Sequence, residues 1–156
     1  MRQILSCLLL LFAGAAAGCQ SAPSADTSMT IHWQRMVDER GGTCDRCGLT
    51  EDAVRSAHAR LKRSLAHLGI SVILTTSALD METFEESPIE SNRIWIAGEP
   101  LEALIGAEVN QSPCCNACGD NDCRTMICDG RVYEAIPSEL IIKAGLVAAS
   151  RLVSEQ

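Results

Sequence analysis

Apolar and polar residues alternate near the start of the folded part of the chain and then change to a longer period. Residues 30–37 place Ile31, Trp33 and Val37 on one face, which is typical of a half-buried strand. From residue 50 the apolar side chains recur every three or four positions, which predicts an amphipathic helix with Thr50 as its N-cap. The face of this helix that we expect to be buried carries Val54, Ala57, Leu61, Leu65 and Leu68.

The segments that follow predict a second and a third strand. Gly69 is expected to end the helix, because glycine readily adopts the left-handed conformation found after helices. Residues 70–79 are rich in branched side chains and predict a strand. Residues 80–92 are polar, acidic and interrupted by Pro88, so we expect a loop there before a short strand at 93–97.

The C-terminal part predicts a short helix, a hairpin and a long closing helix. The short helix begins near Pro100, whereas residues 109–123 show no periodicity. Asp129 and Gly130 lie between two extended segments and form a strong signal for a two-residue hairpin turn. The closing helix opens at Pro137, and its expected buried face carries Leu140, Ile141, Ala144, Val147, Ala148 and Leu152.

This order of elements predicts an α/β fold with a mixed central sheet, flanking helices and a cysteine-rich insertion. A strand–helix–strand unit followed by antiparallel strands and a closing helix is the thioredoxin-like layout. That fold keeps its redox C-x-x-C pair between the first strand and the first helix, where this chain has Cys44 and Cys47. Redox members of the fold usually place a cis-proline directly before the third strand, but Pro88 lies several residues earlier.

The N-terminal 18 residues have the layout of a secretory signal peptide. One positive charge at Arg2 precedes an apolar run over residues 4–17, which is too short for a membrane-spanning helix. The run ends in Ala-Ala-Gly-Cys, which resembles the bacterial lipobox and implies that Cys19 is the lipidated first residue of the mature protein. The alternative is an ordinary signal peptide that is cut after an Ala-x-Ala triplet.

An exported protein held to the bacterial membrane by its N-terminal lipid is therefore expected. Gln20 resembles a sorting signal for the outer membrane of a host with two membranes. Residues 19–28 are small and polar and predict a flexible tether, and residues 29–156 are long enough for one packed domain. The formal net charge is −7, which argues against a nucleic-acid partner because such a partner requires a basic face.

Seven cysteines remain in the domain after the signal peptide and the lipid site are set aside. An odd number of cysteines cannot all pair within one chain. Because free thiols tend to oxidise outside the cytoplasm, we expect them to be paired, bound to metal or cycling between states. These cysteines are Cys44, Cys47, Cys114, Cys115, Cys118, Cys123 and Cys128.

Cys44 and Cys47 are the candidate catalytic residues. Two cysteines three positions apart beside a helix start can exchange a disulfide with a protein partner. The helix dipole and Arg46 favour a thiolate, whereas Asp45 opposes one. A static disulfide and half of a metal site are the alternatives.

The second group, Cys114, Cys115, Cys118 and Cys123, is the candidate metal site. Cys115-x-x-Cys118-Gly119 has the form of a zinc knuckle, and the other two cysteines are the nearest further ligands. Thiolates favour zinc or another thiophilic ion, such as Cu(I) or mercury. Structural disulfides are the alternative, and we expect Cys128, in the hairpin, to be the spare thiol.

Four separate motifs are similar to those of a known family. They are Cys44-x-x-Cys47, residues 90–94 (Glu-Ser-Asn-Arg-Ile), residues 112–125 (Ser-Pro-Cys-Cys-x-x-Cys-Gly-Asp-x-x-Cys-Arg-Thr) and residues 133–137 (Tyr-Glu-Ala-Ile-Pro). The chain resembles, over about residues 31–149, a bacterial and archaeal group of small thioredoxin-like domains catalogued only as a domain of unknown function. The resemblance implies that fold and a role for six cysteines without Cys128, and it implies no particular reaction.

Overall fold

The computed structural model of the protein describes residues 27–114 and 118–154. The predicted signal peptide, most of the predicted tether, the lipid site at Cys19 and the candidate ligand Cys115 lie outside the described residues. No helix in the described part of the chain is long and apolar enough to cross a membrane.

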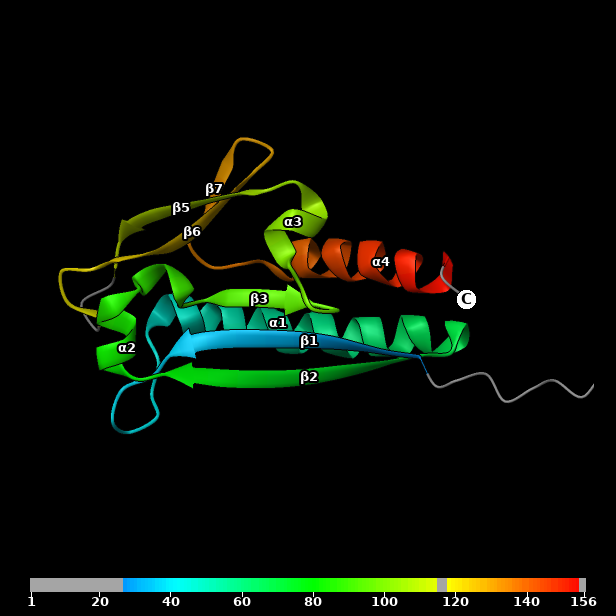
Figure 1. Ribbon diagram of the computed structural model, residues 1–156, viewed down its shortest axis with the longest axis horizontal. Coiled ribbons are helices and arrows are strands. Elements are labelled where there is room, and N and C mark those ends of the chain that lie inside the picture. The colour runs from blue at the N-terminus through cyan, green and yellow to red at the C-terminus, as the bar shows by residue number, and fades with distance from the viewer. Residues whose placement is uncertain (1–26, 115–117, 155–156) are drawn as a thin grey trace, which may run out of the picture.

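The protein has a mixed α/β architecture with two sheets (Figure 1). The larger sheet has the strand order β2-β1-β3-β4, with β1 parallel to β2 and antiparallel to β3. The smaller sheet has the order β5-β6-β7 and is antiparallel. The strands are β1 (Thr27–Met36), β2 (Ile70–Leu79), β3 (Arg93–Ile96), β4 (Glu99–Pro100), β5 (Glu108–Pro113), β6 (Asp122–Cys128) and β7 (Arg131–Tyr133).

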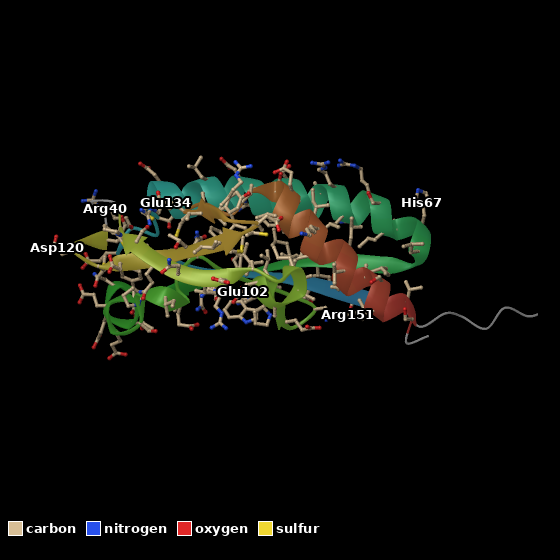
Figure 2. The ribbon with its side chains drawn as sticks, turned by 90° about the horizontal axis from the view of Figure 1, so that it is seen from above. Arg40, His67, Glu102, Asp120, Glu134 and Arg151 are labelled. Atoms are coloured by element: carbon tan, nitrogen blue, oxygen red, sulfur yellow. A yellow bond between two sulfur atoms is a disulfide. The ribbon has the colours of Figure 1, made fainter. Side chains whose placement is uncertain are left out.

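Two long helices, α1 and α4, pack against each other and against the larger sheet (Figures 1 and 2). The helices are α1 (Asp45–Leu65), α2 (Met81–Glu86), α3 (Leu101–Ile105) and α4 (Ser138–Ser154), with 3₁₀ turns η1 (Ala66–Leu68) and η2 (Pro88–Glu90). The alternation predicted for the first strand buries Ile31 and Trp33. Ala57 and Leu61 of α1 and Ile141 of α4 belong to the same buried core. The core is therefore mainly aliphatic.

Several local predictions are confirmed. β2 covers residues 70–79 as expected, and Gly69 follows η1 with a left-handed φ of +71°. Asp129 and Gly130 both have positive φ, at 51° and 74°, which is the conformation that a two-residue hairpin turn requires. Leu68 was expected to be buried but is 57 % exposed, because α1 ends at Leu65 and the chain turns away.

Two further local predictions are wrong. Residues 80–92 contain α2 and η2 rather than only a loop, and Asp80 begins α2 by accepting a hydrogen bond from the backbone N–H of Thr83 at 2.8 Å. Residues 109–123, in which the sequence shows no periodicity, begin with most of β5, which pairs with β6. Thr50 is not an N-cap, because α1 begins at Asp45 and Thr50 lies within it.

Candidate functional site

The first cysteine pair lies at the N-terminal end of α1. Cys44 is the N-cap of this helix, with extended backbone angles, and its carbonyl oxygen accepts a hydrogen bond from the N–H of Gly48 at 2.8 Å. Cys47 follows within the first turn. Only 3 % of Cys44 and 2 % of Cys47 are exposed, so both side chains belong to the core. The early start of α1 places the whole C-x-x-C segment within reach of the helix dipole.

Cys47 holds its proton more firmly than an ordinary cysteine. A hydrogen bond to Cys44, burial and the negative charge of an ionised Cys44 all raise the pKa of the Cys47 thiol. Hydrogen bonds from Ser91 and Thr43 act in the opposite direction, and the Sγ of Cys47 lies 3.8 Å from the Oγ of Ser91. When the pair is reduced, Cys47 is therefore suited to donate a hydrogen bond to a Cys44 thiolate.

The second cysteine group lies where the smaller sheet approaches α1. A disulfide joins Cys114 to Cys123, with 4.9 Å between their Cα atoms. The backbone N–H of Cys114 donates to the carbonyl oxygen of Asn121 at 2.9 Å, which closes the turn between β5 and β6. The sulfur atoms of Cys114, Cys118 and Cys123 all lie within 4.8 Å of one another. Three of the four predicted ligands are thus together.

Arg46 connects the two cysteine groups. Its guanidinium donates to the Oγ of Ser112 at 3.1 Å and to the carbonyl oxygen of Pro113 at 2.6 Å, directly before Cys114 in the chain. The same side chain pairs with Glu134 at 2.8 Å. Sequence reasoning assigned Arg46 only an electrostatic role and missed this connection, for which the sequence carries no local signal.

A second connection runs through the segment before β3. Ser91, which lies beside Cys47, follows η2, and η2 packs against β6. The carbonyl oxygen of Ile89 in η2 accepts a hydrogen bond from Arg124 at 3.1 Å, and Arg124 is the neighbour of Cys123. Arg124 is buried and also pairs with Glu102. Both cysteine groups therefore belong to one site, formed by α1, η2, β5 and β6.

Cys128 lies apart from this site. It is buried at the end of β6, and its thiol points toward the carboxylate of Asp129 at 3.8 Å. It belongs neither to the three-sulfur group nor to the buried cluster that contains Cys44, Cys47, Cys118 and Cys123. Cys128 is therefore a suitable control for experiments on the other cysteines.

A depression of about 440 Å³ opens beside Cys44. Leu49, which lines it, is 62 % exposed although it is a large apolar residue. The lining residues are Thr43, Cys44, Asp45, Gly48, Leu49 and Asp52. The surface next to the first cysteine thus combines an apolar contact with two carboxylates.

Comparison with known proteins shows which family the chain belongs to. A family model described as "Domain of unknown function (DUF2703)" matches residues 29–145, which include the cysteines of the site. The chain belongs to this family. A relative described as "Uncharacterized protein", from Archaeoglobus fulgidus, is 39 % identical to this DUF2703 chain over 113 residues, which is 72 % of the chain and 82 % of the relative. No solved structure matches the chain.

Proposed function

We propose that this protein is an exported, lipid-anchored, thioredoxin-like protein that exchanges disulfides through Cys44 and Cys47. The observation that carries the proposal is the position of the pair, at the first turn of α1 within a parallel β1–α1–β2 unit. The antiparallel β3 and the closing helix α4 complete the layout that we expect of the fold. Ser91, rather than a proline, faces Cys47 from the segment before β3.

Cys44 is the attacking nucleophile in this proposal. Its thiolate attacks one sulfur of a substrate disulfide, which forms a mixed disulfide and releases the other substrate sulfur as a thiolate. Cys47 then loses its proton and attacks the Sγ of Cys44, which releases the second substrate thiolate and leaves a Cys44–Cys47 disulfide. The raised pKa of Cys47 keeps it protonated until this second step.

The substrate class that fits the surface is a disulfide-containing protein. The depression beside Cys44 and the exposed side chain of Leu49 provide an apolar contact for an extended segment of a partner chain. The lipid at Cys19 would hold this activity at the membrane, at the outer membrane in a host that has two. A short tether would let the domain reach substrates near the surface.

The test is reduction of insulin by the full-length protein, with dithiothreitol as the electron donor. Cys44→Ser should lower the rate to the uncatalysed background, and Cys47→Ser should accumulate a mixed disulfide between Cys44 and the substrate, seen by mass spectrometry. Cys128→Ser is the control and should keep the wild-type rate, since Cys128 lies outside the site. Equal rates for Cys44→Ser and the wild type would overturn the proposal.

A second candidate function is binding or transport of a thiophilic ion, with both cysteine groups as ligands. The proximity of three sulfur atoms, all within 4.8 Å, favours it. In that case the metal bound per chain should fall when either Cys44 or Cys118 is replaced. Elemental analysis of the purified full-length variants separates it from the exchange proposal, in which Cys44→Ser changes only the reaction rate.

A further inference from the structure

The Cys114–Cys123 disulfide has a third sulfur beside it. The Sγ of Cys118 lies within 4.8 Å of both sulfurs of the bond. In a zinc–thiolate site each Zn–S bond is about 2.3 Å, so two sulfurs on one ion lie at most about 4.6 Å apart. Tetrahedral bonds of that length place the sulfurs about 3.8 Å apart. Once the S–S bond is open, the sulfurs of Cys114 and Cys123 can move apart and that of Cys118 can move closer until all three bind one ion.

The surroundings of the three sulfurs suit a thiolate site. Cys118 is 1 % exposed and Cys123 is 5 % exposed, and both lie in the apolar core, so few water molecules compete for the ion. The guanidinium of Arg46, bonded to the carbonyl oxygen of Pro113 and to Glu134, adds positive charge beside Cys114. Such a charge favours ionised sulfur. The tight turn at Gly119, with a φ of +65°, brings Cys118 back toward β6.

We infer that this disulfide is a redox gate on a metal site, whose ligands are Cys114, Cys118 and Cys123 and whose cargo is a thiophilic divalent cation of the zinc class. An external dithiol opens the gate. It transfers two electrons and two protons to the S–S bond, which gives two cysteine thiols, and it becomes a disulfide itself. The ion then displaces the thiol protons, which pass to solvent, and binds the three thiolates. An external disulfide closes the gate again: it accepts two electrons from the thiolates of Cys114 and Cys123 and two protons from solvent, and it becomes a dithiol. The Cys114–Cys123 bond then re-forms and the ion is released.

Cys44 and Cys47 belong to the same buried core as Cys118 and Cys123. Delivery of these electrons within the chain by Cys44 and Cys47 is the part of the inference that rests on the proposed function. Arg46 lies between them in sequence and is bonded to the residue before Cys114. In the reduced state, attack of Cys44 on Cys114 would release Cys123 as a thiolate. Attack of Cys47 on Cys44 would then release Cys114 and leave the first pair oxidised.

The test measures zinc binding by the full-length protein in its oxidised and reduced forms, by competition with a chromogenic chelator under argon. The reduced protein should bind one Zn²⁺ per chain, and its affinity should exceed that of the oxidised protein by more than about a hundredfold. Bound Zn²⁺ should also protect Cys114, Cys118 and Cys123 from alkylation, as mapped by mass spectrometry. Equal affinities in the two forms, or no protection of Cys118, would overturn the inference.

Variants identify the ligands. After chemical reduction, Cys118→Ser should lower the Zn²⁺ affinity by about tenfold or more, whereas Cys128→Ser, at the end of β6, should leave it unchanged. The Cys44→Ser/Cys47→Ser double variant should still bind Zn²⁺ like the wild type. A loss of binding in that double variant would overturn the three-ligand assignment, and the insulin assay would still decide the exchange activity separately. Alkylation mapping of the wild type needs no variant and covers the case in which Cys118→Ser does not fold.

Discussion

Replacing Arg46 with methionine tests whether this side chain holds the two cysteine groups together. The guanidinium makes hydrogen bonds to Ser112, Pro113 and Glu134, and the side chain is only 14 % exposed. Methionine keeps the unbranched apolar stem but removes the charge and every donor. The variant should therefore be less stable than the wild type, and the end of β5 should separate from α1.

The loss of stability can be worked out from these contacts. Hydrogen bonds to a hydroxyl and a carbonyl contribute about 0.5–1.5 kcal/mol each, so the two together contribute about 1–3 kcal/mol. The ion pair with Glu134, whose side chain is 54 % exposed, adds about 0.2–1 kcal/mol. Removing a positive charge from the N-terminal turn of α1 stabilises the folded state by about 0.3–1 kcal/mol, because the helix dipole disfavours a cation there. The expected net destabilisation is about 2 kcal/mol, within a range of about 0.2–4 kcal/mol.

Arg55→Met is the matched control. Arg55 lies on the same helix and also pairs with a glutamate, Glu51, at 2.6 Å, but its side chain is 64 % exposed and bonded to nothing outside α1 in the hydrogen bonds of the described residues. Its replacement should cost about 0.5 kcal/mol or less. Urea unfolding followed by circular dichroism measures both variants. Equal midpoints for the two variants would refute the role given to Arg46.

Three further outcomes are expected. Because a hydrogen bond to its partner cysteine and burial raise the pKa of Cys47 above its ordinary 9.0, the folded state binds this proton more tightly. Stability should then be full below about pH 9 and fall at higher pH, and Cys47→Ala should flatten this fall in urea titrations. Glu102→Gln leaves Arg124, whose side chain is 7 % exposed, without its carboxylate and should cost about 3 kcal/mol in the same assay. Gly145→Ala would place a methyl group 2.5 Å from Cδ1 of Leu61, a clash that should cost about 1–3 kcal/mol against a gain in helix propensity of about 1 kcal/mol. The double variant with Leu61→Ala should lose less stability than the two single variants together, and strict additivity would contradict the close packing of α1 and α4.

The elements that the sequence predicts well are those whose signal is local. β2 buries Ile70 and Val72 and is bounded by a glycine, and the Asp129–Gly130 turn is specified by its own two residues. β5 was missed because its residues are almost all exposed, so they do not alternate, and the strand exists only through its pairing with β6. α2 did carry a local signal, since Asp80 caps it and Phe84 is fully buried, but the acidic composition concealed it.

The start of α1 shows why a cap signal can mislead. Thr50 is a good N-cap residue by composition, yet its hydroxyl donates to the carbonyl oxygen of Arg46 and accepts from the N–H of Ile136. It joins the helix to the segment before α4, which only the tertiary structure reveals. The true N-cap, Cys44, makes no side-chain capping bond and so gives no sequence signal.

The roles given to the cysteines stay predictions, and the pairing seen in the structure was not predictable from their spacing. Spacing suggested Cys115 and Cys118 as the two sulfurs of a zinc knuckle, and Cys115 lies outside the described residues. The disulfide joins Cys114 to Cys123. The pairing of β5 with β6 places Ser112 opposite Cys123, and Cys114, two residues after Ser112, then lies diagonally across from Cys123. That register depends on how two strands pair in the folded sheet, so it cannot be predicted from the number of residues between the cysteines.

The four motifs that carry the family resemblance meet at this one site, although about 90 residues separate the first from the last. Ser91 of the second motif lies beside Cys47 of the first. Ser112 of the third motif accepts a hydrogen bond from Arg46, which lies within the first motif. Glu134 of the fourth motif forms an ion pair with Arg46, so each of the other three motifs contacts the first at the site. A helix cap or a single disulfide would need only one or two of these segments. Their convergence on two cysteine groups is what a site needs if electrons from one group are to control the ligands of the other.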